Sequence, residues 1–156
     1  MKTIHTIVLL PAIMLMAGLS ATAQNSKALQ EAKEAIAASN DIYFTSFARN
    51  DPAVFVERYA ADCQIMAPGM PALSGREGAL QFFRKAYDKI GLRGGKFITT
   101  AIFGDGVEYV TEVGLWQSFD ASKQVFDDGK FLVLWKKTAE GWKMFRDSFS
   151  SNHPAK

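Results

Sequence analysis

The sequence predicts an α+β domain in which one curved antiparallel sheet packs on three N-terminal helices. Two observations lead to this fold class. Helical periodicity is confined to the first part of the chain, and the residues after Gly91 form runs of aromatic and branched residues between glycine-containing turns. Helices followed by meandering strands are typical of a single sheet that wraps its helices. The sequence contains no repeat, linker or low-complexity segment.

The first 23 residues are predicted to be a signal peptide. Lys2 precedes the apolar run 7–19, and an Ala-Thr-Ala sequence ending at Ala23 has the small-x-small pattern that signal peptidase cleaves. The alternative, a membrane helix, is disfavoured because Pro11 and Gly18 interrupt the run and no basic stop-transfer flank follows. We expect cleavage near Ala23 and release to the periplasm or the medium, without a stable membrane anchor.

Composition limits the remaining residues, 24–156, to one domain and a few function classes. Removing 23 of 156 residues leaves 133, which suits a single core. The formal net charge of the whole chain is only +2 and no basic block is present, so we expect no nucleic-acid partner. The one cysteine, Cys63, cannot form an internal disulfide, and a buried apolar role is favoured for it. With only His5 and His153, a histidine-based triad or multi-histidine metal site is excluded, and we predict neither cofactor nor metal.

The first helix is predicted over residues 26–49. Its apolar and aromatic residues recur at steps of three, four and seven, which marks one helical face: Leu29, Ala32, Ile36, Tyr43 and Phe47. Asn40 lies on the same face. Because a polar amide on an apolar face needs hydrogen-bond partners, we expect Asn40 to find them either in the packed interior or in a wet pocket.

Two further helices and a short strand are predicted next. Asp51 is a typical N-cap with Pro52 at the first helical position, and this second helix is expected to run to about Tyr59 or Ala60. A strand is predicted over residues 63–67.

The third helix is predicted to start with a capping box, in which Ser74 is the cap and Glu77 follows three residues later. Its apolar face contains Leu80, Phe83, Tyr87 and Ile90, and Gly91 ends it. The strands come afterwards. They are predicted over four ranges: 96–103, 107–119, 124–136 and 142–150.

Two details of these strands remain open in the sequence. The third of the four could begin only after a turn at 127–129, which contains two aspartates and a glycine. Gly114 interrupts the second, which predicts a bulge or sharp bend there.

The last predicted strand contains a charged pair among aromatic residues. Arg146 and Asp147 are adjacent, so in a regular strand they point to opposite faces. We expect Asp147 to point inward on the face of Phe145 and Phe149, with Arg146 on the other face beside Met144. A carboxylate among aromatics would have a raised pKa and could exchange a proton near neutral pH. An ion pair with a neighbouring Lys or Arg is the equally weighted alternative.

Several segments together resemble the nuclear-transport-factor-2-like superfamily, and specifically its SnoaL-like and ketosteroid-isomerase-like branch. These segments are the helix with Asn40 and Tyr43, NDPAVFVERYAADCQIMAPG, LSGREGALQFF, YVTEVGLW and the closing GKFLVLWKKTAEGWKMFRDSFSSN. The resemblance implies a cone of curved sheet that is closed by helices and encloses a pocket. It also implies dimers through the outer sheet face. Ketosteroid isomerases move a proton with a carboxylate and SnoaL-like cyclases need a pocket acid, for which Asp147 is the nearest counterpart.

Within this pocket we predict catalytic roles for Asp147, Glu112 and Tyr43. Ligand contacts are predicted for a second group: Asn40, Tyr59, Met66, Phe83, Trp116 and Arg146. Core packing is the favoured alternative for each aromatic residue and for Met66. For Glu112 an exposed position is favoured, because it shares a strand face with Glu108.

The predicted function is that of an exported small-molecule pocket protein. In the leading hypothesis it is a cofactor-independent isomerase, cyclase or dehydratase acting on a small, mostly apolar carbonyl compound, with Asp147 as proton shuttle and Tyr43 or Tyr59 as hydrogen-bond donor. The alternatives are a non-catalytic binding protein for a hydrophobic metabolite and a homodimeric scaffold. The expected partners are a small hydrophobic molecule and a second copy of the chain.

Overall fold

The computed structural model describes residues 12–154 of the chain. Residues 1–11 of the predicted signal peptide therefore lie outside the described residues. The elements in chain order are α1 (Ala12–Arg49), α2 (Pro52–Val56), β1 (Tyr59–Met66), β2 (Leu73–Ser74), α3 (Gly75–Arg84), the π-helix η1 (Lys85–Ile90), β3 (Gly94–Gly104), β4 (Tyr109–Phe119), β5 (Val125–Thr138) and β6 (Gly141–Ser151).

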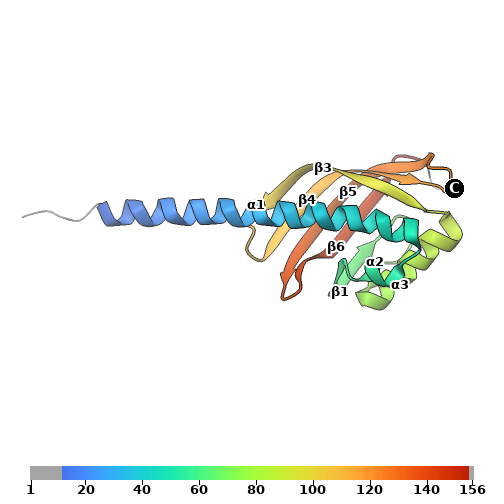
Figure 1. The fold of residues 1–156 in the computed structure, drawn as a ribbon, viewed down its shortest axis with the longest axis horizontal. Coiled ribbons are helices and arrows are strands. Elements are labelled where there is room, and N and C mark those ends of the chain that lie inside the picture. The colour runs from blue at the N-terminus through green and yellow to red at the C-terminus, as the bar shows by residue number, and fades with distance from the viewer. Residues whose placement is uncertain (1–11, 155–156) are drawn as a thin grey trace, which may run out of the picture.

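The α+β prediction is confirmed: the helices precede a curved six-stranded sheet with the order β2-β1-β6-β5-β4-β3 (Figure 1). The sheet is not wholly antiparallel, however, because β1 pairs with β6 in parallel. A parallel pair needs a long crossover, and here the chain from β2 to β5 supplies it. A meander of neighbouring strands therefore describes β3 to β6 but not β1.

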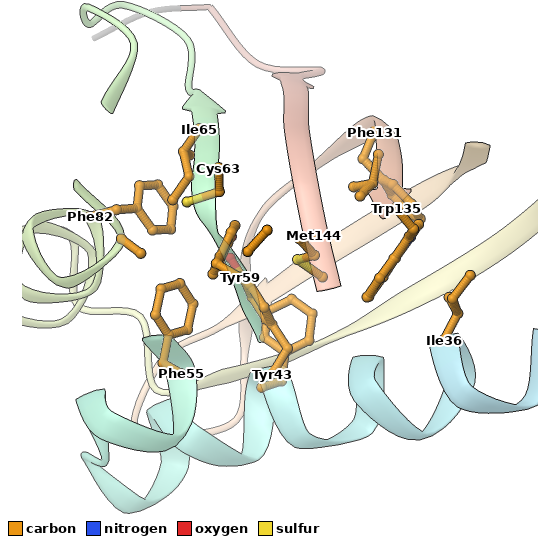
Figure 2. Close-up of a cluster of buried hydrophobic side chains, with 14 of the residues drawn as sticks. Ile36, Tyr43, Phe55, Tyr59, Cys63, Ile65, Phe82, Phe131, Trp135 and Met144 are labelled. Atoms are coloured by element: carbon orange, nitrogen blue, oxygen red, sulfur yellow. The ribbon is translucent and has the colours of Figure 1, made fainter. Parts of the chain in front are cut away.

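The apolar face of α1 packs on the concave side of this sheet. Ala32, Ile36 and Phe47 are fully buried and Tyr43 nearly so, which confirms the periodicity read from the sequence. Figure 2 shows the cluster that forms between α1 and the strands, including Tyr59 from β1 and Trp135 from β5. Each such side chain contributes about 1.5–3 kcal/mol of burial free energy, so this cluster is the main stabilising element of a chain without a disulfide.

The second helix is shorter than predicted. Asp51 does cap it, accepting a hydrogen bond from the Val54 amide at 3.1 Å. The helix ends at Val56, and Tyr59 already belongs to β1. Pairing with β6 explains the early end: Met144 on β6 donates its amide to the Arg58 carbonyl at 2.9 Å, which draws the chain into the sheet.

The predicted capping box of the third helix is not formed. Ser74 is the N-cap residue, but its side chain makes no capping hydrogen bond. The residue lies in β2 opposite Gln64, so the sheet sets its extended conformation. The end of the helix is as predicted, because Gly91 adopts the left-handed conformation at φ 85° after η1.

The two open details of the strands are settled by the register. β5 runs from Val125 through residues 127–129, so no turn lies there. The β4–β5 turn lies earlier, where Asp120 accepts hydrogen bonds from the Ser122 and Gln124 amides. The bulge at Gly114 is displaced to the facing strand: the register shifts between Thr99 and Ala101 of β3.

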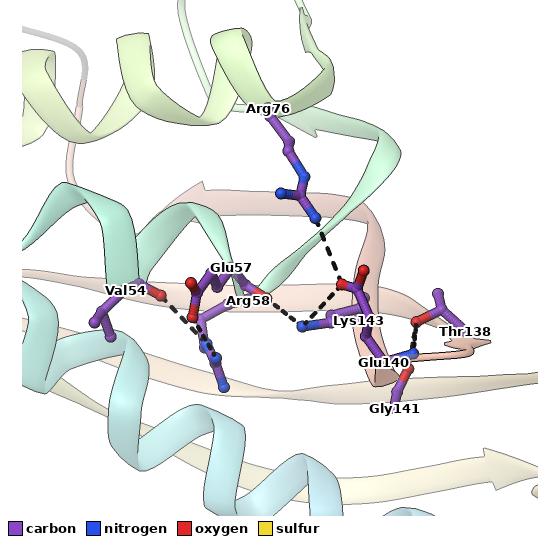
Figure 3. Close-up of polar contacts among 8 residues, drawn as sticks. All are labelled: Val54, Glu57, Arg58, Arg76, Thr138, Glu140, Gly141 and Lys143. Carbon is purple, nitrogen blue, oxygen red and sulfur yellow. Dashed lines mark hydrogen bonds and ion pairs between the residues drawn. The ribbon is translucent and has the colours of Figure 1, made fainter.

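Ion pairs and a hydrogen bond connect the β5–β6 hairpin to the helices (Figure 3). Glu140 in the turn lies 3.5 Å from Arg76 of α3 and 3.9 Å from Lys143 of β6. Lys143 also donates to the Glu57 carbonyl at 2.7 Å, just after α2. Because such partly exposed ion pairs contribute about 0–1 kcal/mol each, they orient the hairpin more than they stabilise it.

Candidate functional site

A bulge in β6 decides which residues of the charged strand face inward. Trp135 pairs with Met144 and Leu134 with Arg146, so Phe145 is left without a partner. Met144 and Asp147 are consequently both buried. The prediction that Asp147 shares a strand face with Phe145 is therefore wrong, because the bulge reverses the alternation of side chains at this point. The expected inward direction of Asp147 is confirmed.

Asp147 lies in the wall of an apolar cavity of about 170 Å³. For comparison, a cavity of about 150 Å³ in another protein holds one benzene molecule. Eight of the eighteen lining residues are aromatic and come from elements far apart in the sequence: Tyr43, Phe44, Phe82, Phe97, Trp116, Phe126, Phe131 and Phe149. The polar members of the wall are Asp147, Ser118, Asp127 and Lys85.

Two tyrosines accompany the Asp147 carboxyl. Tyr59 is fully buried and donates its hydroxyl to Asp147 Oδ2 at 2.7 Å. Tyr43, on α1, lines the cavity, and Figure 2 shows it next to Tyr59. The phenol of Tyr43 also interacts with that of Tyr59, which lowers the pKa of Tyr43 against the larger effect of burial. The three residues thus form a polar chain from α1 through β1 to β6 inside an aromatic surrounding.

This surrounding changes the acidity of the groups. Burial raises the pKa of Asp147 to about 6, the Tyr59 hydrogen bond lowers it, and the charge of Glu112 raises it. Burial, followed by the Asp147 charge, also raises the pKa of both tyrosines well above the ordinary value. At neutral pH the tyrosines are therefore neutral donors, while Asp147 exchanges its proton readily.

Glu112 is the second buried carboxylate, and its predicted exposure is wrong. It is completely buried on the inner face of β4, whereas Glu108 lies exposed before that strand. Asn40 Nδ2 donates to Glu112 Oε1 at 2.8 Å, and Trp135 Nε1 donates to Oε2 at 2.9 Å. The Thr99 hydroxyl is a third donor. Burial raises the pKa of Glu112, and these three hydrogen bonds act in the opposite direction.

The remaining predicted contacts fall in five places, the last of which is that of Arg146. Trp116 lies in the cavity wall, and its Nε1 donates to the Lys130 carbonyl at 3.3 Å. Asn40 donates to Glu112 and does not line the cavity, and its Oδ1 is buried without a hydrogen-bond partner in the described part of the chain. Phe83 is buried in the core but does not line the cavity, and Met66 lies at the exposed end of β1.

Arg146 lies on the outer face of β6, away from the cavity. Its guanidinium stacks 3.6 Å from the Phe145 ring centre and donates to the Asp62 carbonyl at 3.0 Å. The ion pair weighed for Asp147 is not formed, because no Lys or Arg within the described residues pairs with it.

Sequence reasoning missed several residues of the site. Thr99 and Trp135 hold Glu112, and Lys85 reaches the cavity, where it donates to the Met70 sulfur at 3.6 Å. Nothing in the local pattern distinguished them from surface or core residues. A useful signal was present for Trp135: a buried indole needs an acceptor, and Glu112 is an acid on a neighbouring strand.

Within residues 12–154 no three His, Cys, Asp or Glu side chains are grouped closely enough to hold a metal ion. No helix in the described part of the chain has an apolar stretch long enough to cross a membrane.

The chain matches no protein-family model and no curated protein sequence. Solved structures, in contrast, share its fold. A ketosteroid isomerase-like protein from Erwinia carotovora atroseptica SCRI1043 is 20% identical with a TM-score of 0.61, covering 75% of this chain and 93% of the other. An NTF-2 like protein of unknown function from Shewanella oneidensis MR-1 is 19% identical with a TM-score of 0.64, covering 76% and 98%. An NTF2-like protein with a cystatin-like fold from Novosphingobium aromaticivorans is 15% identical with a TM-score of 0.67, covering 94% of each chain.

This protein therefore has the nuclear-transport-factor-2-like fold, as the sequence resemblance implied. At identities of 20% or less the likeness carries the fold and no activity. Function has to be argued from the cavity and its residues.

Proposed function

We propose that this protein is an exported pocket enzyme that binds a small, mostly apolar carbonyl compound and moves a proton on it without a cofactor. The isomerase, cyclase and dehydratase classes share this chemistry. One observation carries the proposal: Asp147, with a pKa of about 6, lies in the wall of an aromatic cavity without a cationic partner among the described residues.

The positions of the two tyrosines suggest separate roles. Tyr59 gives its hydroxyl to Asp147 and does not line the cavity, so it positions the carboxyl. Tyr43 lines the cavity and stays neutral, so it is the donor that would face a ligand oxygen. This assigns the hydrogen-bond donor to Tyr43 and leaves Asp147 Oδ1 for the ligand, because Oδ2 is held by Tyr59.

In the proposed step the ionised Asp147 removes a proton from the carbon next to the carbonyl. The C–H electron pair forms a carbon–carbon double bond, and the carbonyl oxygen becomes an enolate oxygen that accepts a hydrogen bond from Tyr43. The protonated Asp147 then returns the proton to another carbon, which gives isomerisation, or to a leaving hydroxyl, which departs as water. A group with a pKa near 6 can both take and return the proton at neutral pH.

The test compares Asp147→Asn with Asp127→Asn. Both aspartates line the cavity, but only Asp147 is deeply buried. A library of small ketones, enones and aromatic carbonyl compounds is first screened by thermal shift, and compounds that bind are assayed for turnover. We expect Asp147→Asn to retain binding and lose turnover by at least about 10²-fold, with Asp127→Asn close to the parent protein. Unchanged turnover in Asp147→Asn would remove this residue from the mechanism.

The alternative function is a binding protein for a hydrophobic metabolite, which the same aromatic cavity favours. It predicts ligands that shift the melting temperature but are recovered chemically unchanged. Asp147→Asn would then alter affinity alone.

Export is the part of the proposal that rests on the sequence of residues 1–23. Expression of the full chain in a Gram-negative host, followed by mass measurement of the periplasmic product, tests it. The proposal requires a mature chain that begins near Gln24. A product that keeps residues 1–23 in the cytosol would contradict it.

A second copy of the chain is the partner that we propose for the outer sheet face. Four apolar side chains on three neighbouring strands of that face are 40–59% exposed: Ile98, Phe103, Leu115 and Leu132. Ile98 lies directly opposite Leu115 in the register, so the patch is continuous. Leu115→Lys should give a monomer in sedimentation experiments, with Lys96→Ala at the polar end of β3 as the control. A parent protein that sediments as a monomer would exclude the dimer.

A further inference from the structure

The two buried carboxylates lie in one row across the sheet. Glu112 of β4 is paired with Val133 of β5, and Val133 is paired with Asp147 of β6. All three residues are buried on the inner face. Because neighbouring strands are about 4.8 Å apart, the backbones of Glu112 and Asp147 are separated by roughly 10 Å of apolar protein. Charges at this distance inside a protein interact more strongly than on the surface, where water and salt screen them.

The hydrogen bonds of Glu112 favour its charged form. Trp135 Nε1 can only donate, and Asn40 presents its Nδ2, so these bonds occupy both carboxylate oxygens with N–H donors. The Thr99 hydroxyl donates to the same oxygen as Asn40. A protonated Glu112 would have to lose one of these donors, whereas the carboxylate accepts all three.

We propose that Glu112 is a positioning residue for Asp147: its fixed negative charge, in the same row with one strand between them, keeps the Asp147 carboxyl ready to take and return a proton near neutral pH. The proposal rests on the function proposed above only for its use in catalysis. The electrostatic coupling itself is a property of the protein without substrate.

Other groups also face Asp147 and have to be separated from Glu112. Those that surround it or share its cavity are Tyr43 on α1, Tyr59 and Cys63 on β1, Lys85 on η1 and Asp127 on β5. The tyrosines are neutral near pH 7, and burial likewise raises the pKa of the Cys63 thiol. The charged groups whose effects on the ionisation of Asp147 have to be compared are therefore Glu112, Lys85 and Asp127.

The decisive variant is Glu112→Gln, which removes the charge and keeps the shape. The fold can accept it, because Asn40 can turn its amide so that its unpartnered Oδ1 accepts from the new side-chain amide. The carboxyl carbon of Asp147 is followed by NMR from pH 4 to 9. We expect its titration midpoint to move to lower pH, by about three- to tenfold in proton concentration. If the enzyme is active, the acidic limb of its kcat/KM profile should move by the same amount.

Asp127→Asn is the matched control, because it removes a carboxylate from the cavity wall but outside the row. Asp127→Asn should shift the titration midpoint of Asp147 by less than half the shift expected for Glu112→Gln. A Glu112→Gln protein with an unchanged Asp147 midpoint would overturn the proposal, and so would a larger shift in Asp127→Asn.

A measurement on the parent protein covers the case in which Glu112→Gln does not fold. The carboxyl carbon of Glu112 should show the chemical shift of the ionised form at pH 7, and a shift of the protonated form at that pH would contradict the proposal. Both NMR readouts are independent of turnover. Failure to find any substrate would therefore count against the proposed enzyme, while the NMR midpoints alone would decide the coupling of Glu112 to Asp147.

Discussion

Asp147 and Glu112 are both buried carboxylates on the inner face of one sheet, yet their surroundings differ. Glu112 is enclosed by donors from three other elements: Asn40 on α1, Thr99 on β3 and Trp135 on β5. Within residues 12–154 Asp147 has the single donor Tyr59, and it borders an aromatic cavity. The number of donors therefore separates a carboxylate that joins elements of the fold from one that faces a cavity.

The same contrast appears in the free energy that each group adds. A buried charge that accepts three hydrogen bonds is strongly tied to its partners, so removing it leaves several donors without an acceptor. A buried charge with one donor is only partly compensated, so the folded protein holds it at a cost. Variants of the two carboxylates and of their donors should therefore differ in stability.

Removal of Glu112 should destabilise the protein most. In Glu112→Val the amide of Asn40, the hydroxyl of Thr99 and the indole of Trp135 all lose their acceptor. We expect the free energy of unfolding to fall by about 3–5 kcal/mol in urea titrations. The control Glu108→Val changes an exposed glutamate and should remain within about 0.5 kcal/mol. Equal effects of the two substitutions would show that the Glu112 network is not a structural element.

Removal of the Asp147 charge should do the opposite and stabilise the protein. The pKa of Asp147 is raised from 3.8 to about 6, so the folded state holds its proton more tightly than the unfolded state. The ionised carboxylate therefore destabilises the folded state. The loss in the free energy of unfolding begins above about pH 4, is complete above about pH 6, and amounts to about 3 kcal/mol at most. Asp147→Asn should raise the free energy of unfolding by about 1–3 kcal/mol at pH 7.5 and by little at pH 4.

The exposed Asp41 on α1 provides the control for this variant. Asp41→Asn should show neither the gain nor its dependence on pH. If Asp147→Asn were less stable than the parent protein at every pH, the carboxylate would be a structural group like Glu112.

The sequence predicted the helices and the four long strands because their signals are local. The face of α1, the Asp51 cap and the end of the third helix at Gly91 each depend on residues within a few positions. It failed where a distant partner decides. The second helix ends early because β1 pairs with β6. The Ser74 side chain forms no capping hydrogen bond because β2 pairs with β1.

The candidate site depended even more on distant partners. The inward direction of Asp147 was predicted, but the bulge at Phe145 that produces it was not, since nothing in the strand marks it. Glu112 was expected at the surface because alternation with Glu108 was the only available signal. Its burial follows from Asn40, which is 72 positions away in the sequence, and from Trp135, which is 23 positions away.

The single donor of Asp147 provides the next test. Tyr59→Phe removes the hydroxyl that binds Oδ2 and leaves the ring in place. Because this hydrogen bond lowers the pKa of Asp147, the NMR midpoint should rise above about 6. The free energy of unfolding should fall by about 1.5–2 kcal/mol at pH 7.5 and by less at pH 4, where Asp147 is protonated. Tyr87→Phe, on a half-buried ring of η1, should leave the midpoint unchanged. An Asp147 midpoint that falls in Tyr59→Phe would contradict the assigned role of the hydroxyl.

The smallest change in the free energy of unfolding is expected when Glu112 loses one of its three donors. Thr99→Val removes a single hydrogen bond from Glu112, which keeps Asn40 and Trp135. Thr99 is itself exposed, so water can replace part of the loss, and we expect a decrease of about 1 kcal/mol. Its neighbour Thr100 is a matched control, because its hydroxyl donates to the Val113 carbonyl at 3.0 Å rather than to a charge. Thr100→Val should cost about half as much, since hydrogen bonds to charged groups are the stronger ones. A larger loss in Thr100→Val would mean that the bulge of β3, and not the bond to Glu112, is what this threonine pair maintains.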